Sequence, residues 1–178
     1  MILVRTSRLV SAALPAPSND STIRIATVGA SRTMTEIEKQ TIERACEQLQ
    51  YAYARFIDFR DYEGFAELFT VDGVLDAGLE LRGRDAIFSS CQKRSAGLRS
   101  RHVITNSFID VLNHDQARGI CYLSLYRLDQ KESAKPGPLP MPGPAAVGHY
   151  QDSFKRIDSV WKISQRKLHL AFRDDSQV

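Results

Sequence analysis

RHVITNSFIDVL, residues 101–112, marks the point where the chain changes its hydrophobic period. Along this segment the side chains alternate between two sides of an extended backbone, as they do in a β-strand. One side is mainly apolar and carries His102, Ile104, Asn106, Phe108 and Leu112. We expect this side to face the interior, which places a histidine in an apolar environment.

The residues before this segment repeat with helical spacing. TEIEKQTIERACEQLQYAYARF, residues 35–56, has apolar side chains three and four positions apart, the pattern of an amphipathic helix. Thr35 with Glu38 fits a capping box at its start. Further elements are predicted as a second helix over 62–69, short strands around 74–77 and 79–82, and a third helix from about 84 to 95.

The residues after this segment alternate again and predict strands over 116–128, 147–157 and 160–172. Because helices come first and long strands come last, we expect an α+β fold with a curved antiparallel sheet wrapped against the helices. Five prolines at alternate positions place an extended loop over 131–146. This loop is either a disordered insertion or a flap over a cavity mouth.

Length and composition favour one globular domain. The chain has 178 residues, 43% hydrophobic and 25% charged, which fits the range of about 100–200 residues per domain. No apolar run approaches the ~18 residues of a membrane helix, so no membrane partner is expected. Cys46, Cys91 and Cys121 lack CxxC or CxH spacing, so we predict neither disulfides nor a metal site, and we infer a reducing compartment.

The positive charge is confined to the N-terminal segment. Residues 1–33 supply the whole formal net charge of +3, so the remainder is neutral and no nucleic-acid partner is expected. We interpret 1–33 as a flexible tail, either a transit peptide or an over-extended start before Met34, followed by one domain over 34–178. The expected location is cytoplasmic, or the mitochondrial matrix if 1–33 is a transit peptide.

The sequence has no motif for nucleotide or ester chemistry, because GxGxxG, GxxxxGK[ST] and GxSxG are all missing. Histidines and carboxylates remain. A neutral imidazole in an apolar cavity, with a carboxylate on one ring nitrogen, can act as a general base near neutral pH. On the residues alone, a single inward histidine such as His102 is more often a hydrogen-bonded core residue than a catalytic one.

Four segments together resemble the SnoaL-like branch of the nuclear-transport-factor-2-like superfamily. They are YAYARFIDFRDYEGFAELFTVDG at 51–73, GRDAI at 83–87, RHVITN at 101–106 and FKRIDSVWKISQRKL at 154–168. Within that branch the chain most resembles scytalone dehydratase, hexachlorocyclohexane dehydrochlorinase and bile-acid 7α-dehydratase. The resemblance covers about residues 36–172. It implies a cone-shaped α+β barrel that encloses a pocket, with no metal or organic cofactor.

The resemblance also implies site residues. An Asp at the end of the first helix and a His at the start of the first long strand form the catalytic dyad in this group, and they match Asp58 and His102. A pocket tyrosine matches Tyr53, and an Arg on the last strand is matched most nearly by Arg166.

Each group has a chemical role in a 1,2-elimination. His102 would take a proton from a carbon beside an electron-withdrawing group, while Asp58 would hold the other ring nitrogen. Tyr53 would hydrogen-bond the leaving oxygen or the developing enolate, with Tyr62 or Arg166 as second choices.

The resulting hypothesis is a cofactor-independent lyase, of dehydratase or dehydrohalogenase type, for a hydrophobic cyclic or polyketide-like small molecule. Asn106 and Phe108 would line its substrate pocket. The alternatives are an isomerase or cyclase with the same dyad, or a non-catalytic small-molecule-binding or oligomerisation domain. By analogy with the superfamily, we expect a homodimer or homotrimer.

One geometric point counts against the dyad. Asp58 follows Tyr53 by five residues, which is about 140° around a helix axis at ~100° per residue. We therefore expect the helix to end or distort before Asp58, or one of the two side chains to lie on the surface.

Overall fold

The computed structural model describes residues 33–130, 137–141 and 143–175, which all belong to the compact unit Thr33–Val178. The tail predicted at 1–33 lies outside these residues except for its last position. Positions 131–136 and 142 of the predicted proline-rich loop also lie outside them. None of the described helices is long and apolar enough to cross a membrane.

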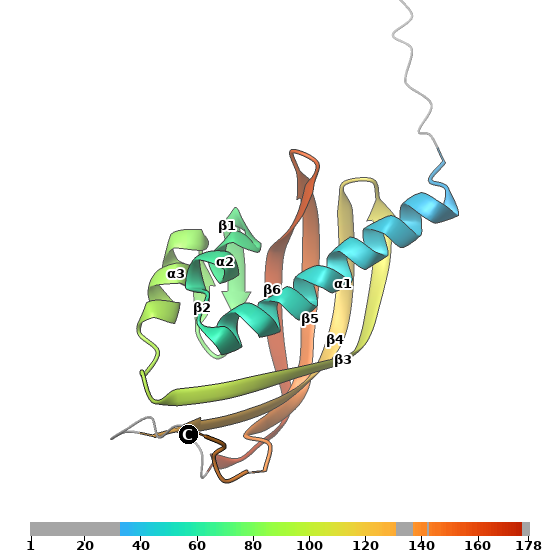
Figure 1. Cartoon of the computed structure of the whole chain (residues 1–178). Helices are drawn as coiled ribbons and strands as arrows, with labels where there is room; N and C mark the ends of the chain where they lie inside the picture. Colours follow the sequence, from blue (N-terminus) through green and yellow to red (C-terminus); the bar gives the residue numbers. More distant parts are fainter. Residues whose placement is uncertain (1–32, 131–136, 142, 176–178) are drawn as a thin grey trace, which may run out of the picture. The chain divides into compact units, whose positions relative to one another are not determined.

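Helices lead and long strands follow, as the change of period predicts (Figure 1). The elements are α1 (Glu36–Phe59), α2 (Tyr62–Glu67), β1 (Phe69–Asp76), β2 (Glu80–Arg82), α3 (Arg84–Gln92), β3 (Leu98–Asn113), β4 (Gln116–Asp129), β5 (Ala146–Ile157) and β6 (Val160–Arg173). The long strands start and end within a few residues of their predicted bounds. Helix α3 ends before the predicted residue 95, and strand β1 begins earlier than predicted.

Helix α1 begins at the predicted capping box. The N–H of Glu38 donates to Thr35 Oγ1 at 3.2 Å, and the N–H of Thr35 donates to Glu38 Oε2 at 2.9 Å. The helix ends where Arg60 adopts a left-handed conformation with φ 63° and its N–H donates to Phe56 O. The Arg60 guanidinium also donates to three carbonyl oxygens of residues 95–98, at 2.6–3.0 Å. These bonds fasten the end of α1 to the loop that leads into β3.

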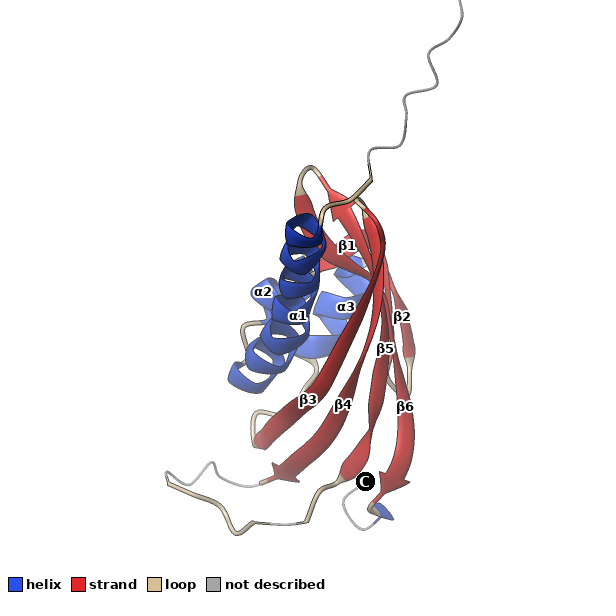
Figure 2. Cartoon of the chain, turned by 90° about the vertical axis from the view of Figure 1, so that its right-hand side faces the viewer, coloured by secondary structure: helices blue, strands red, loops and turns tan. Residues whose placement is uncertain are grey.

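The strands form one sheet in the order β2-β1-β6-β5-β4-β3. Neighbouring strands are antiparallel except for β1 and β6, which are parallel. The predicted α+β class is therefore confirmed, with a mixed sheet in place of a wholly antiparallel one. Within the described residues, β2 and β3 are the outer strands, so the sheet curves without closing into a barrel. The three helices lie on one face of it (Figure 2).

Strand β3 contains a bulge that changes which side chains face inward. The β3–β4 pairing passes from Thr105↔Tyr122 to Phe108↔Ile120, so two residues of β3 stand opposite one of β4. Asn106 lies in the bulge with φ 50°, a conformation that Asn tolerates better than most residues. Alternation restarts out of phase after this point.

The prediction that Asn106 and Phe108 share the inward side with His102 is therefore wrong. Both are exposed, and Phe108 keeps 67% of its surface accessible. Leu112 is also exposed, whereas Ile109 is buried in place of its neighbours. An outward-facing Phe108 cannot contribute to a pocket on the helix side of the sheet.

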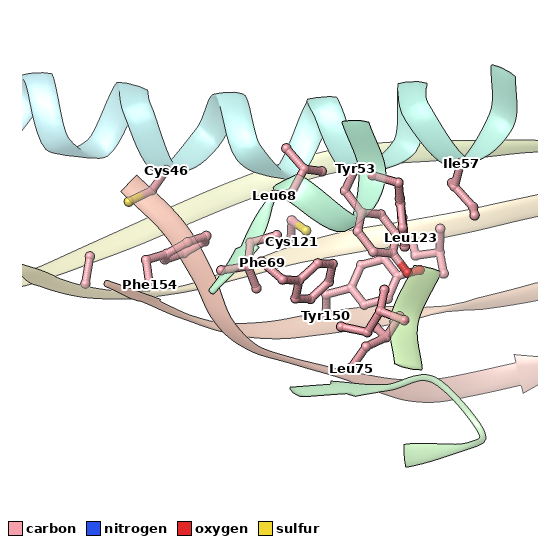
Figure 3. Packing of buried hydrophobic residues seen from close by; sticks show 14 of the residues in the cluster. Cys46, Tyr53, Ile57, Leu68, Phe69, Leu75, Cys121, Leu123, Tyr150 and Phe154 are labelled. Atoms are coloured by element: carbon pink, nitrogen blue, oxygen red, sulfur yellow. The ribbon is translucent and has the colours of Figure 1, made fainter. Parts of the chain in front are cut away.

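The core lies between the helices and the inner face of the sheet, and Figure 3 shows its central part. Three residues of α1 at helical spacing, Cys46, Tyr53 and Ile57, pack from one side. Residues at alternate positions of the long strands pack from the other side, including Cys121 and Leu123 of β4 and Tyr150 and Phe154 of β5. Burying this apolar surface is the main stabilising term of the fold.

Candidate active site

Asp58 and His102 form a buried acid–base pair. Oδ1 of Asp58 lies 2.7 Å from Nδ1 of His102, and only 5% and 9% of the two side chains are exposed. The backbone N–H of His102 donates to Asp58 Oδ2 at 2.7 Å, and the Ser100 hydroxyl donates to Oδ1 at 2.7 Å. Three hydrogen-bond donors thus hold the carboxylate in place, and the carboxylate in turn holds the imidazole ring through its Nδ1 atom.

Helix α1 runs unbroken to Phe59, yet both Tyr53 and Asp58 are buried in the site. The expectation that the helix distorts, or that one of the two side chains lies on the surface, is therefore wrong. Tyr53 points into the core (Figure 3), while Asp58 accepts hydrogen bonds from Ser100 and His102 of β3, an outer strand of the sheet. Both side chains can be buried although they lie about 140° apart around the helix axis, because β3 and the core lie on different sides of the helix.

The hydrogen bonds to Asp58 keep it ionised. Burial alone raises the pKa of this carboxyl group, because it disfavours the charged form. The His102 ring and N–H and the Ser100 hydroxyl outweigh that effect, so the pKa lies below its ordinary value. Asp58 is consequently a carboxylate at neutral pH and can stabilise a positive charge on the imidazole.

His102 forms part of the wall of a cavity of about 250 Å³. The apolar lining of this cavity includes Ile57, Phe65, Leu75, Leu123, Leu125 and Leu168. Since Nδ1 of His102 is held by Asp58, Nε2 is the nitrogen left for a ligand, and no described residue hydrogen-bonds it. Three larger hollows, of about 480, 460 and 330 Å³, lie beside Phe108, against residues 138–141 and beside Phe56, and none of the three includes His102.

Tyr53 and Tyr150 also line this cavity. Their ring centroids are 5.4 Å apart. Figure 3 shows the two rings side by side. Burial raises the pKa of both phenols, and the neighbouring Arg166 guanidinium only partly opposes that rise. Both hydroxyls therefore stay protonated at neutral pH and can donate to an oxygen of a ligand.

The model of the SnoaL-like domain matches residues 38–167 of the chain. The chain belongs to the SnoaL-like domain family. The resemblance inferred from the four sequence segments is thereby confirmed. No curated protein matches the chain.

Solved structures share the fold of this SnoaL-like domain. A variant of Rv3472, a protein of unknown function from Mycobacterium tuberculosis, is 27% identical with a TM-score of 0.63, and the match covers 81% of this chain and 80% of that one. A candidate scytalone dehydratase from Novosphingobium aromaticivorans is 21% identical with a TM-score of 0.65, covering 81% and 93%. A hexachlorocyclohexane dehydrochlorinase, LinA type 2, is 14% identical with a TM-score of 0.66, covering 79% and 92%.

Arg166 of the SnoaL-like domain does not line the cavity, contrary to the prediction for it. Its side chain is fully buried, and it donates to both oxygens of Asp152 at 2.7 Å. Its guanidinium lies over the rings of Tyr53 and Tyr150, 4.1 and 4.4 Å from their centroids. The ion pair holds Arg166 behind the tyrosines, so it supports the cavity wall without reaching a ligand.

Tyr62 is also placed away from the cavity. Its hydroxyl accepts a hydrogen bond from Arg60 Nη1 at 3.1 Å, at the exposed end of α1. Among the predicted site residues, the structure thus brings together Asp58, His102 and Tyr53. It places Tyr62 and Arg166 outside the cavity and, as described above, Asn106 and Phe108 on the other face of the sheet.

A polar network that the sequence analysis missed runs behind the site. Gln50 Nε2 donates to Asp152 Oδ2 at 2.9 Å, and the Ser107 hydroxyl donates to Gln50 Oε1 at 2.6 Å. Gln50 falls on the apolar stripe of α1, between Cys46 and Tyr53. A polar residue in such a stripe needs a buried hydrogen-bond partner, so the position of Gln50 in the sequence could have predicted a buried polar network.

Three further residues of the site were also missed. Tyr150 and Asp152 occupy every-second positions of β5 together with Gly148 and Phe154, so their burial could be predicted from the two-residue period of a strand alone. Ser100 precedes His102 by two residues and shares its side of β3 for the same reason.

Cysteine chemistry does not fit this SnoaL-like domain. Burial raises the pKa of Cys91, the one cysteine in the cavity lining, to about 11, although Arg94 lowers it in part. Its thiol is therefore not a nucleophile at neutral pH. In the described part of the chain, no group of three His, Cys, Asp or Glu side chains is arranged to hold a metal ion.

Proposed function

We propose that this SnoaL-like domain is a cofactor-independent lyase that removes water or a hydrogen halide from a small hydrophobic cyclic molecule. The observation that carries the proposal is the contact of 2.7 Å between Asp58 Oδ1 and His102 Nδ1 at the wall of an apolar cavity. The names of two structural neighbours, a candidate scytalone dehydratase and a hexachlorocyclohexane dehydrochlorinase, describe eliminations and give additional support.

His102 is the general base of the proposed reaction. Its Nε2 takes a proton from a carbon beside an electron-withdrawing group, and the electrons of the broken C–H bond form the new double bond. The leaving group departs with its bonding electrons, as hydroxide that takes up a proton or as halide. Asp58 holds the proton on Nδ1 and stabilises the imidazolium that forms.

Tyr53 and Tyr150 supply the hydrogen-bond donors. Both tyrosines line the cavity together with His102, and the centroids of the Tyr53 and His102 rings are 6.2 Å apart. A donor in this position can stabilise negative charge on a leaving oxygen or on an enolate oxygen. General-base help is worth about 10²–10⁴ in rate, so a second contribution of this kind is required.

The cavity limits the substrate class. Its volume of about 250 Å³ is below the range of roughly 300–1,000 Å³ for drug-sized ligands, so it suits a compact molecule. Leucine and aromatic side chains dominate its wall and favour an apolar ring over a sugar or a peptide.

The test is a mass-spectrometric screen of compact cyclic alcohols and halides that carry a carbonyl group beside the acidic carbon. We expect products lighter by water or by hydrogen halide, and we expect His102→Gln to reduce their formation by about 10²–10⁴. His169→Gln is the matched control, because His169 stacks on His149 on the other face of the sheet. A product of unchanged mass would instead support an isomerase, and an equally active His102→Gln variant would falsify the mechanism.

A further inference from the structure

A chain of hydrogen bonds leads from Arg94 to the acid–base pair. Arg94 Nη2 donates to the Ser100 hydroxyl at 3.0 Å, and that hydroxyl donates to Asp58 Oδ1 at 2.7 Å. The same carboxylate oxygen holds Nδ1 of His102 at 2.7 Å. Since Arg94 lies in the loop between α3 and β3, whereas Asp58 belongs to α1, the chain joins three parts of the fold at the site.

The proton of the Ser100 hydroxyl has a fixed direction. A guanidinium only donates hydrogen bonds, so Ser100 Oγ accepts from Arg94 and its single proton goes to Asp58. Ser100 is 4% exposed, so bulk solvent does not compete for this hydroxyl. Hydrogen bonds in such a chain polarise one another, and a charged donor at its start strengthens the bond that reaches the carboxylate.

The Arg94 guanidinium is committed to this chain. Its hydrogen bond to Ser100 is the only one that its side chain makes with the described residues, and it forms no salt bridge with them. Its Nε is buried and has no acceptor among the same residues. The positive charge of Arg94 therefore reaches the acid–base pair through Ser100.

A cation in this position has a defined consequence for the proposed base. Asp58 favours the imidazolium form of His102, because it places a negative charge beside Nδ1. A general base must instead be neutral before it takes a proton. Positive charge two hydrogen bonds away opposes the effect of Asp58 and favours the neutral ring.

Other titratable groups also face His102 across the cavity. Within the described residues they come from α1, α3, β4 and β5, and they are Tyr53, Cys91, Arg127 and Tyr150. Burial raises the pKa of both tyrosines and of Cys91, so these three groups are neutral at pH 7. On β3 itself, Arg101 places its guanidinium 4.9 Å from the centroid of the Phe59 ring. Arg127 and Arg101 are the same in all variants compared below, so their charges cancel from the comparison.

We propose that Arg94 is a positioning residue of the acid–base pair, which acts through Ser100 to orient Asp58 and to keep His102 neutral before the reaction. This inference rests on the proposed function, because a neutral ring is needed only if His102 is the base. It assigns a role in the reaction to the loop between α3 and β3.

The test is an NMR titration of the histidine rings in the full chain without substrate. The chain has four histidines, and the His102→Gln variant identifies the His102 signal by its loss. We expect Arg94→Gln to raise the midpoint of the His102 titration by about half a pH unit to one pH unit, because one nearby positive charge is removed. Arg94→Lys keeps the charge and should move the midpoint by less than half as much.

Ser100→Ala tests the link without changing the arginine. It should also raise the midpoint of the His102 titration, because Asp58 loses a donor and attracts the imidazole proton more strongly. In the Ser100→Ala background, the further change Arg94→Gln should have less than half of its effect in the wild type. Arg99→Gln is the matched control, because Arg99 lies on the same strand but donates to Gly137 O at 2.7 Å. It should leave the midpoint within about 0.2 pH units of the wild type.

Two results would overturn the proposal. One is a midpoint that stays unchanged or falls in Arg94→Gln, and the other is an Arg94→Gln effect of equal size with and without the Ser100 hydroxyl. If Arg94→Gln does not fold, Ser100→Ala carries the test, and an unchanged midpoint in that variant rejects the proposal.

The titration needs no substrate, so it is independent of the lyase proposal. A chain that shows the expected shift but eliminates nothing rejects only the lyase function. A chain with turnover whose His102 midpoint does not respond to Arg94→Gln rejects only the role of Arg94. In an active chain, the acidic limb of the pH profile of kcat/KM should move with the NMR midpoint. A purely structural role of Arg94 would lower kcat without moving that limb.

Discussion

Two buried carboxylates of this SnoaL-like domain each contact a basic side chain at 2.7 Å, yet the two pairs differ in what surrounds them. Asp58 holds His102 at the wall of a cavity, where one imidazole nitrogen remains for a ligand. Asp152 holds Arg166 with both side chains fully buried and two tyrosine rings stacked on the guanidinium.

The difference separates a chemical role from a supporting one. An imidazole exchanges its proton near neutral pH, whereas a guanidinium stays charged. The Asp152 pair also raises the pKa of Arg166 against the opposing effect of burial. The Asp58 pair is therefore suited to proton transfer, and the Asp152 pair to holding Tyr53 and Tyr150 in place.

The largest effect is expected from Asp152→Asn. This change leaves the buried Arg166 without a counter-ion and should lower the free energy of unfolding by about 3–5 kcal/mol, measured by urea denaturation. Asp110→Asn is the matched control, because Asp110 and Arg118 form an exposed pair at 2.7 Å. Its loss should be at most about 1 kcal/mol. Similar losses in the two variants would contradict the assignment of a supporting role to the buried pair.

Asp58→Asn tests the other pair. The amide cannot hold the same imidazole tautomer or stabilise the imidazolium, so kcat should fall on the order of 10²-fold, which corresponds to about 2.7 kcal/mol. Substrate affinity should change little, because Asp58 is separated from the cavity by His102. A variant that loses affinity and kcat equally would indicate that Asp58 only maintains the cavity.

A smaller loss of stability is expected from Ser107→Ala. It removes the donor to Gln50 Oε1 and leaves a buried acceptor of the Asp152 network unpaired, at a cost of about 1–2 kcal/mol in unfolding free energy. Ser95→Ala serves as the control, because it removes an exposed hydroxyl bond to Asp129. Thermal and urea unfolding should both rank Ser107→Ala as the less stable variant.

The smallest effect is the pH dependence that Asp58 contributes. Its pKa is lower in the folded chain than in the unfolded chain, where it is about 3.9. Its stabilisation is therefore fully present above that unfolded value and is lost as the pH falls through the lower folded value. The difference in unfolding free energy between the wild type and Asp58→Asn should shrink below about pH 4. A constant difference across that window would rule out this ionisation as its source.

Local signals in the sequence were enough for the helices and for most of the order of elements. Thr35 and Glu38 mark the start of α1 because a capping box involves only neighbours in the chain. The positions of Asp58 and His102 followed from the family resemblance, whereas geometry on an ideal helix argued against them. That argument failed because it assumed that only one side of the helix is buried. A second side of the helix is buried against β3, and Asp58 lies on that side.

Strand registers were beyond reach from the sequence because bulges change them. Counting back from the β5–β6 turn, where Ile157 pairs with Val160, would place Asp152 opposite Gln165. An irregularity between Ser153 and Phe154 moves it opposite Arg166 instead. The bulge at Asn106 reversed the side of Phe108 in the same way. One extra residue in a strand carries no compositional mark, yet it decides which side chains meet.

The Arg60 side chain links the end of α1, which carries Asp58, to the start of β3, which carries His102. It follows Asp58 by two residues and is tied to carbonyls of residues 95–98, just before Ser100 and His102. A ligand that pushes the start of β3 must therefore carry the last turn of α1 with it, and the acid–base separation should be the same in the empty and the filled cavity. Amide hydrogen exchange near Asp58 should accordingly stay slow on ligand binding.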